Sequence, residues 1–271
     1  MGTQFYKMTG SGNDFVILDG RVSPPEAWTT NRIVSVCDRR HGVGADGLVV
    51  LTEAGANAAR MTFFNADGSR AAMCGNAALC STRLSARLGL ADAAGMTLVT
   101  DAGTYQTRCV EPTERAEVNL ADVAMPAEVP GIALGPGELA VSFTVVGVPH
   151  LVVRVEDVDG VDLLRRGREL RFHPAVGPAG ANANFVSAPV AAGEPWLIRT
   201  FERGVEGETL ACGTGTVAAA LAVAGEAGLP ATFRSRGGAI LSVSARIDGD
   251  RAGEVWLCGE GRLVFEGTLP D

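Results

Sequence analysis

A repeated unit built around two Cys-Gly pairs constrains this chain more than any other feature of its sequence. Cys74 and Cys212 lie about half the chain length apart. Each follows an apolar strand-like run and a polar turn, and each is followed by glycine, a small polar residue and a helix-like segment. The helices are predicted to end at Gly89 and Gly228, where glycine permits a left-handed cap. Two similar halves are therefore expected.

Short strand-like runs, separated by turn residues, make up most of the remaining sequence. This pattern favours an antiparallel α+β fold over a doubly wound parallel sheet. A hairpin is predicted after each helix, over 97–110 and 231–247, and a bend at Pro149 and His150 is predicted to join two strands. The other runs are 15–18, 48–51, 61–64, 141–148, 151–155, 196–201, 241–247 and 254–258.

The predicted architecture is two pseudo-symmetric halves, each a mainly antiparallel sheet wrapped around a central helix, with the active-site cleft between them. The helix after Cys212 is apolar on every face over 216–224, which indicates complete burial. We expect an N-terminal half of residues 1–115 that contains Cys74 and a C-terminal half of residues 116–259 that contains Cys212. The boundary is expected in the proline-rich stretch that follows the first hairpin.

Composition and charge exclude several classes of protein. Hydrophobic residues make up 46% of the chain and its mean hydropathy is +0.18, which excludes disorder. The net charge of −8 and the pI of about 5.0 argue against a nucleic-acid or membrane-surface partner. No apolar run is long enough to cross a bilayer, and the first seven residues lack the apolar core of a signal peptide. A cytoplasmic protein is expected.

The same inventory argues against common cofactors. Lys7 is the only lysine, so it alone could form the Schiff base that a pyridoxal-phosphate enzyme requires. The six cysteines contain no Cys-x-x-Cys pair, and the three histidines lie far apart in the sequence. No metal site and no cofactor are therefore expected, and the cysteines should be free thiols.

The chemistry is predicted to reside in the two repeated cysteines. A helix N-terminus stabilises a thiolate and attracts a carboxylate, because its first amides are unpaired. One Cys-Gly turn alone reads as a buried small residue before a helix, but two equivalent copies indicate a pair of acid-base groups. Two such groups on opposite sides of one carbon can invert it without a cofactor. The other cysteines, at positions 37, 80, 109 and 258, are predicted to be packing residues.

A set of motifs spread along the chain resembles the diaminopimelate epimerase family. The motifs occur in the family's order and together are specific, although Gly10 to Asn13 alone would be weak. They are Lys7-Met8-x-Gly10-x-Gly12-Asn13-Asp14-Phe15, His41-Gly42-x-Gly44-x-Asp46-Gly47, Phe64-Asn65-x-Asp67-Gly68-Ser69, Met73-Cys74-Gly75-Asn76, Pro149-His150, Asn182-x-Asn184-Phe185-Val186, Glu202-Arg203-Gly204 and Glu208-Thr209-x-Ala211-Cys212-Gly213-Thr214-Gly215.

The resemblance implies a homodimer whose subunits interconvert LL- and meso-diaminopimelate, on the route to lysine and peptidoglycan, without metal or cofactor. It also implies that residues from about 260 to 271 return to the N-terminal half. Cys74 and Cys212 resemble the catalytic thiols, and His150 and Glu202 resemble residues that tune them. The residues that resemble substrate contacts are Asn13, Asn65, Gly75, Asn76, Asn182, Glu202, Arg203, Gly213 and Thr214.

Three departures from the family pattern bear on the substrate. Val148 stands where the family often has asparagine, Gly47 stands where some members have glutamine, and segment 204–208 is one residue longer than the commonest form. Purely structural roles for the polar residues also stay open. Asn65 reads equally well as a turn residue, Asn182 and Asn184 as loop residues, and Glu202 with Arg203 as a solvated ion pair.

Three other functions remain open. The chain could be a racemase of another amino acid on the same architecture, which a substrate screen would reveal. It could be a thiol redox protein, although no resolving Cys-x-x-Cys supports that. A non-catalytic amino-acid-binding protein would leave the duplicated cysteine unexplained.

Overall fold

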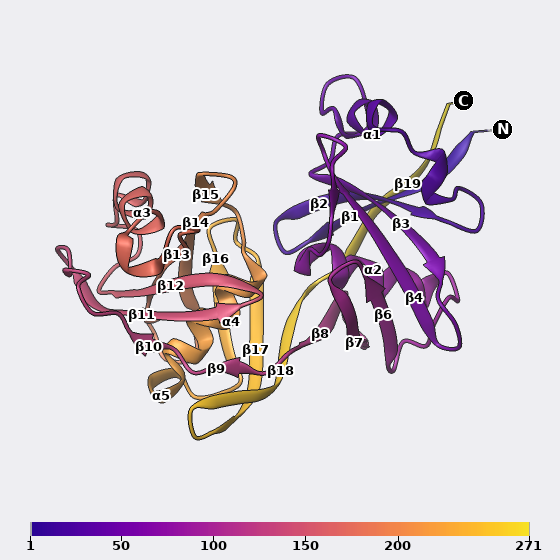
Figure 1. The fold of residues 1–271 in the computed structure, drawn as a ribbon. Helices are drawn as coiled ribbons and strands as arrows, with labels where there is room; N and C mark the ends of the chain where they lie inside the picture. The colour runs from indigo at the N-terminus through magenta and orange to yellow at the C-terminus, as the bar shows by residue number, and fades with distance from the viewer. Residues whose placement is uncertain (1, 271) are drawn as a thin grey trace. The chain divides into compact units, whose positions relative to one another are not determined.

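The protein is described by a computed structural model over residues 2–270, and its contacts divide it into two units. Unit 1 comprises Met1–Asn119 and Cys258–Asp271, and unit 2 comprises Leu120–Leu257. The chain leaves unit 1 within strand β8 (Arg115–Leu120) and returns within strand β18 (Arg251–Glu260). Each unit is described below by itself (Figure 1).

Unit 1 is a curved sheet around one long helix. Its strands and helices are β1 (Thr3–Gly10), β2 (Asn13–Asp19), the short 3₁₀ helix η1 (Pro25–Ala27), α1 (Thr30–Cys37), β3 (Gly47–Glu53), β4 (Ala58–Asn65), β5 (Arg70–Ala71), α2 (Gly75–Arg87), β6 (Met96–Thr100), β7 (Gly103–Val110), β8 and the last strand, β19 (Arg262–Leu269).

Unit 2 repeats this arrangement. It contains β9 (Val123–Ala124), β10 (Ala127–Glu128), β11 (Glu138–Val146), β12 (Val148–Val155), α3 (Leu163–Arg171), the 3₁₀ helix η2 (Pro174–Val176), β13 (Asn182–Ser187), β14 (Trp196–Glu202), β15 (Gly207–Thr209), α4 (Gly213–Ala222), α5 (Ala224–Ala227), β16 (Ala231–Ser235), β17 (Ile240–Asp248) and most of β18.

Strand pairing follows the same order in both units, which confirms the predicted repeat. In unit 1, β1 pairs antiparallel with β2, β2 parallel with β3, β3 antiparallel with β4, β4 parallel with β6, and β6 antiparallel with β7. In unit 2 the pairs β11–β12, β12–β13, β13–β14, β14–β16 and β16–β17 have the same directions in the same order. Each parallel pair is joined through a helix, as parallel strands require.

Helices α2 and α4 are the central helices of the two units. Helix α2 contacts β1 to β4, β6, β7 and β19, and α4 contacts β11 to β14, β16 and β17. Both helices carry small side chains on the faces that the strands enclose, so the sheet can approach closely; Ala77 and Ala78 in α2 and Ala218 to Ala220 in α4 are fully buried. The fold class predicted from the sequence is therefore confirmed for each unit.

A second helix covers the outer side of each sheet. Ile33 and Val36 of α1 pack in a core with Leu48 and Val50 of β3. Leu163 and Leu170 of α3 pack in the equivalent core with strands of unit 2. Each unit thus has a helix on both faces of its sheet, and this explains why β3, with the sequence GLVVLTE, is apolar without alternation.

Several local predictions are confirmed. Helix α2 ends at Arg87, and Gly89 has a φ of +69°. Gly228 has a φ of +67° and a ψ of 175°, so both glycines have a positive φ after a helix, although Gly228 does not have the ψ of a left-handed helical cap. The predicted hairpins are β6–β7 and β16–β17.

Two local predictions and one open alternative are wrong. Pro149 and His150 do not form a bend, because both lie inside β12; the chain turns at Gly147, two residues before Pro149, where φ is +67°. The second helix is interrupted at Val223, where α4 ends and the short α5 begins. Asn182 and Asn184 are not loop residues, because they lie in β13 and are buried.

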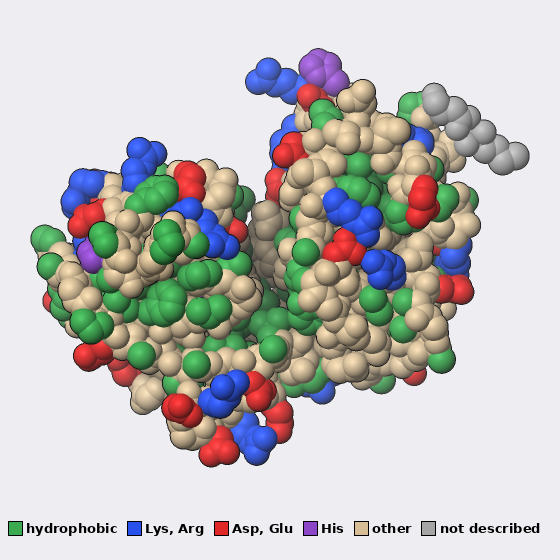
Figure 2. Space-filling model, viewed as in Figure 1, with side chains coloured by type: hydrophobic (Ala, Val, Ile, Leu, Met, Phe, Trp, Pro, Cys, Tyr) green, Lys and Arg blue, Asp and Glu red, His purple; other side chains and the backbone are tan. Residues whose placement is uncertain are grey.

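The surface and the helices of the described part are unremarkable for a globular protein. Side chains of both charge signs are interspersed over the visible face of each unit (Figure 2). Within residues 2–270, no helix combines the length and the apolar character that a membrane span requires.

Candidate active site

The candidate residues of unit 1 gather at one edge of its sheet. Asn13 is the first residue of β2, and Asn65 is the last residue of β4, where the register pairs it with Gly47 at the start of β3. Because β2 and β3 are parallel and β4 is antiparallel to β3, these three strand ends lie on the same edge. Cys74 is the N-cap of α2, in an extended conformation with φ −141° and ψ 121°.

A hydrogen bond joins Asn13 to the first turn of α2. The side-chain amide of Asn76 donates to Oδ1 of Asn13 over 2.7 Å, and Asn76 is buried. Asn65 is exposed, and its amide donates to the Ser69 hydroxyl over 3.0 Å within the turn that follows β4. The structure therefore brings Asn13 and Asn76 together next to Cys74, whereas the recorded contact of Asn65 is that of a turn residue.

Unit 2 has equivalent residues at the equivalent edge. His150 lies near the start of β12 and pairs in register with Asn182, the first residue of β13. Glu202 is the last residue of β14, the position that Asn65 occupies in β4 of unit 1. Cys212 is the N-cap of α4, with φ −132° and ψ 110°, so its backbone conformation matches that of Cys74.

A buried hydrogen-bond network lies beneath Cys212. The imidazole of His150 is fully buried, and its Nδ1 atom lies 3.2 Å from the amide nitrogen of Asn184 and 3.5 Å from that of Asn182. Oδ1 of Asn182 accepts the backbone N–H of Arg203 over 2.7 Å. Asn182 thus connects His150 to the segment that carries Glu202 and Arg203.

Two side chains at this edge have displaced pKa values. Burial, together with the positive charge of Arg203, lowers the pKa of His150 to about 3. Burial raises the pKa of the Glu202 carboxyl above its ordinary value. His150 is therefore neutral under physiological conditions, whereas Glu202 takes up a proton more readily than an exposed glutamate does.

We expect the His150 ring to stay neutral throughout the mildly acidic range. NMR signals of the ring, assigned by comparison with a His150→Gln variant, should not change between about pH 7.5 and about pH 4.5. The unfolded chain binds a proton on this residue in that range and the folded chain does not, so the His150 contribution to stability falls as the pH decreases. A titration of this ring near pH 6.5 would contradict the assignment.

Asn184 is a residue whose importance the sequence did not reveal. Its amide nitrogen donates to the carbonyl of Leu151 over 2.9 Å, and its Oδ1 accepts the hydroxyl of Thr200 over 2.9 Å. A Cβ atom on Gly215, in the first turn of α4, would lie only 2.2 Å from that oxygen and 3.2 Å from Sγ of Cys212. Asn184 therefore supports the start of α4, and the signal that could have found it is the Asn-x-Asn spacing on one strand face.

The two helix starts can bind an anionic group. The first amides of an α-helix have no partner within the helix, and the helix dipole adds partial positive charge at the same end. Cys74 is half-buried, and Cys212 is buried, with 9% of its surface exposed. Each helix start combines a thiol with an anion-binding backbone, which suits proton transfer at a carbon next to a carboxylate.

Three of the other four cysteines have the surroundings expected of packing residues, whereas Cys258 is half-buried and accepts a hydrogen bond from Arg115. Cys37, Cys80 and Cys109 are buried, and burial raises the pKa of each of these thiols. Within residues 2–270, no group of three or more His, Cys, Asp or Glu side chains is arranged to hold a metal ion.

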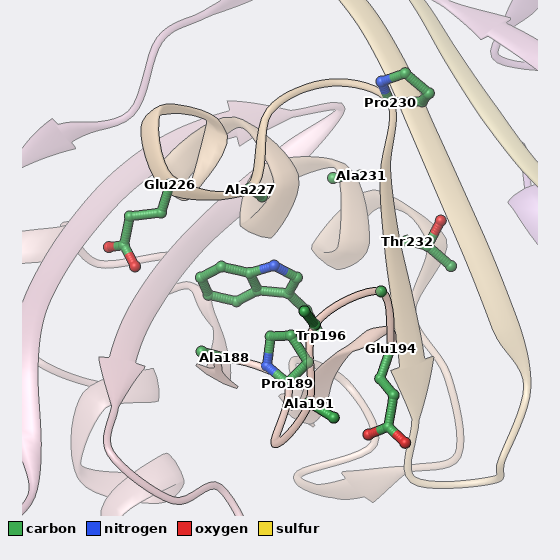
Figure 3. Close-up of a pocket in the computed structure, with 12 residues that line it drawn as sticks. Ala188, Pro189, Ala191, Glu194, Trp196, Glu226, Ala227, Pro230, Ala231 and Thr232 are labelled. Carbon is green, nitrogen blue, oxygen red and sulfur yellow. The ribbon is translucent and has the colours of Figure 1, made fainter.

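A separate pocket of about 530 Å³ lies in unit 2. Figure 3 shows the Trp196 indole in it, with Glu194 and Glu226 around the ring. None of the candidate residues lines this pocket. The guanidinium of Arg154 lies 4.6 Å from the centre of the Trp196 ring and forms an ion pair with Glu226 over 2.9 Å. The negative charge of Glu226 in the pocket wall is therefore paired within the protein.

Comparison with known proteins identifies the family. The profile of the diaminopimelate epimerase family matches residues 5–125 and 142–263. A curated diaminopimelate epimerase from Gemmatimonas aurantiaca is 44% identical, over 98% of this chain and 98% of that protein. One from Aquifex aeolicus is 38% identical over 99% of this chain and 98% of that protein. The chain belongs to the diaminopimelate epimerase family.

Solved structures share the fold of this diaminopimelate epimerase family member at low sequence identity. A phenazine biosynthesis protein of the PhzF family from Bacillus anthracis has a TM-score of 0.75 at 14% identity, with full coverage of both chains. A hydroxyproline epimerase from Agrobacterium vitis has a TM-score of 0.66 at 17% identity, over 98% of this chain and 90% of that chain. These likenesses concern the fold alone.

Two of the departures from the family pattern have structural settings. A Cβ atom on Gly47 would lie 2.5 Å from the ring of Phe63 and 2.6 Å from the carbonyl of Phe64, so a glutamine at this position would displace the phenylalanine. Val148 is the first residue of β12 and supplies no polar group at this edge. In this member of the diaminopimelate epimerase family, neither position supplies a polar side chain.

Proposed function

We propose that this protein is a cofactor-independent epimerase that interconverts LL- and meso-diaminopimelate, with Cys74 and Cys212 as its two acid-base groups. One observation carries the proposal: these cysteines are the N-caps of the two buried central helices, and equivalent polar strand ends lie beside them. Membership of the diaminopimelate epimerase family supports the choice of substrate.

The reaction needs only proton transfers. One cysteine, as a thiolate, takes the α-proton, so that an S–H bond forms while the C–H bond breaks and its electron pair stays on the α-carbon. The other cysteine, as a thiol, gives its proton to the opposite face of that carbon and becomes a thiolate. The roles exchange in the reverse direction. Because no electrons leave the substrate, the reaction requires no redox partner.

The helix starts supply the electrostatic part of the mechanism. We assign the backbone amides of Gly75 and Asn76, and of Gly213 and Thr214, to the α-carboxylate of the substrate. Negative charge spreads onto that carboxylate as the carbanion forms, and fixed N–H dipoles stabilise it without reorganisation. This arrangement replaces the electron sink that a pyridoxal cofactor provides in other racemases.

The polar strand ends are assigned to the substrate amines, to its distal carboxylate and to the thiols. Glu202, whose pKa is raised by burial, suits proton exchange with the α-ammonium or with a thiol. Neutral His150 acts through hydrogen bonding rather than charge. Asn13, Asn65 and Asn182 supply neutral hydrogen bonds to the amines and to the distal end.

Arg203 is assigned to the distal carboxylate. Among the residues that the structure describes, none is recorded as an ion-pair partner of its guanidinium, and its backbone is held by Asn182. Arg203→Lys should lower kcat/KM for diaminopimelate by an amount equivalent to ~1–3 kcal/mol of lost transition-state stabilisation. The reason is that a single ammonium charge replaces a planar guanidinium, which can donate two parallel hydrogen bonds to a carboxylate. Steady-state kinetics measure this loss, with Arg234→Lys, at an exposed position of β16, as the matched control. Unchanged kinetics in Arg203→Lys would remove this assignment.

Proton exchange at the α-carbon tests the function directly. Dialysed, chelator-treated protein should incorporate deuterium at the α-position of LL-diaminopimelate in deuterium oxide, under reducing conditions, while the meso isomer accumulates. NMR of the α-position follows both events. Activity that depends on added zinc or pyridoxal phosphate would exclude the mechanism. Faster turnover of a single-headed amino acid, such as histidine or proline, would indicate a racemase with another substrate.

Two further parts of the proposal come from the family alone. We expect a homodimer, which light scattering on the purified protein measures. We also expect the enzyme to act in the cytoplasm, within lysine and peptidoglycan precursor synthesis.

A further inference from the structure

A cluster of four charged side chains lies beside the candidate site of unit 1. We call Lys7, Asp14, Arg39 and Asp46 the Arg39 cluster. The ammonium of Lys7, which is buried, donates to Asp14 Oδ2 over 2.6 Å and to the carbonyl of Gly44. Arg39 donates to both oxygens of Asp14, over 3.0 and 2.6 Å, and to Asp46 Oδ1 over 2.6 Å.

The Arg39 cluster is connected to helix α2 by two hydrogen bonds in series. The second oxygen of Asp46, Oδ2, accepts the side-chain amide of Asn13 over 2.9 Å. Oδ1 of Asn13 then accepts the side-chain amide of Asn76 over 2.7 Å. Asn76 is the second residue of α2, directly after the Cys74–Gly75 pair.

This series also sets the orientation of both amides. An ionised carboxylate can only accept hydrogen bonds, so Asn13 must turn its NH2 group towards Asp46. Its oxygen therefore faces Asn76, which must in turn present its own NH2 group. The oxygen of Asn76 is then buried and, among residues 2–270, has no recorded hydrogen-bond partner.

We propose that Arg39 is a positioning residue of the epimerase reaction, which orients Asn13 and Asn76 through Asp46. The inference rests on the proposed function, because Asn13 and Asn76 are assigned there to the substrate. Arg39 brings Asp14 Oδ1 and Asp46 Oδ1 to the same nitrogen, and without it these two carboxylates repel each other.

The charge state of the cluster supports this role. Burial raises the pKa of Asp14, but hydrogen bonds from Arg39 and Lys7 outweigh that effect and lower it to about 2. Asp14 is therefore ionised at any pH at which the enzyme would work. The side chain of Arg39 is 58% exposed, so removing it opens no cavity in the core.

Steady-state kinetics on three variants test the inference. Arg39→Ala should lower kcat/KM for LL-diaminopimelate by about ten- to a hundredfold, because the two amides lose their fixed orientation. Arg39→Lys should lose less activity than Arg39→Ala. An ammonium can pair with one carboxylate, but it lacks the planar guanidinium that bonds to both Asp14 and Asp46. Arg40→Ala removes an exposed neighbour of the same charge and should change kcat/KM by less than about twofold.

A double-mutant cycle distinguishes positioning from a general structural role. If Arg39 acts through Asn13, then Arg39→Ala should cost far less in an Asn13→Ala background than in the wild type. Equal costs in both backgrounds, or an Arg39→Ala variant that behaves like Arg40→Ala, would overturn the inference.

A second readout is independent of turnover. The NMR signals of the Asn13 and Asn76 side-chain amides should shift in Arg39→Ala and stay unchanged in Arg40→Ala. A wild-type protein that fails to epimerise diaminopimelate would refute the proposed function, whereas unshifted amide signals in Arg39→Ala would refute the positioning role of Arg39.

Discussion

Replacing either Cys74 or Cys212 with alanine should abolish the inversion of diaminopimelate, with a loss of about 10³-fold or more in kcat. Each substitution leaves one face of the α-carbon without a group that can donate or accept a proton, while the other face keeps its thiol. The formation of meso-diaminopimelate from the LL isomer, followed by NMR, measures the effect. Near-wild-type inversion by either variant would contradict the two-base mechanism.

Cys80→Ala is the matched control for this experiment. Cys80 lies on the same helix as the Cys74 N-cap, is fully buried, and has a thiol whose pKa burial raises well above its ordinary value. Its replacement should therefore leave kcat close to wild type and lower the free energy of unfolding by about 1 kcal/mol, the cost of a small cavity.

Gly215→Ala should damage stability and activity together. The new Cβ atom would lie 2.2 Å from Oδ1 of Asn184, and Asn184 is held by Leu151, His150 and Thr200, so it has no free direction in which to move. Helix α4 must shift instead, at a cost of about 1–3 kcal/mol in the free energy of unfolding. The shift moves Cys212, and a displacement of that kind is expected to lower kcat/KM by about a hundredfold.

Gly225→Ala provides the comparison. Gly225 lies in the short helix α5, and apart from its chain neighbours and the backbone of its own helix no atom lies within 4 Å of its added Cβ. Alanine should therefore be neutral or stabilise this helix by up to about 1 kcal/mol. Urea denaturation measures the free energy of unfolding of Gly215→Ala and Gly225→Ala, and steady-state kinetics measure their kcat/KM. Equal values for the two variants would show that Asn184 does not constrain α4.

Elements with a strong local signal were predictable from the sequence. The hairpins β6–β7 and β16–β17 are alternating apolar runs around turn residues, and the helix ends are marked by Gly89 and Gly228. The repeated Cys-Gly pairs located both helix starts, because the residues that begin a helix act over a few positions of the chain.

Elements whose stability comes from distant partners were missed. Strand β1 was not predicted, because its sequence TQFYKMTG lacks alternation; it is held between β2 and β19, which lies at the other end of the chain. Strand β13 was missed because asparagines favour turns, yet here Asn184 has buried partners for both ends of its amide.

The sequence by itself predicted which residues carry the chemistry, namely two cysteines at helix starts, the asparagines, Glu202 and Arg203, and these assignments stay predictions. Only the tertiary structure decided which of them meet. The parallel pairing of β12 with β13 brings His150 to Asn182 and Asn184, and the pairing of β2 with β3 brings Asn13 to Asp46 and thereby to Arg39. Such contacts join residues about thirty positions apart through strand register, which is set by the packing of whole sheets around the central helices rather than by any local pattern.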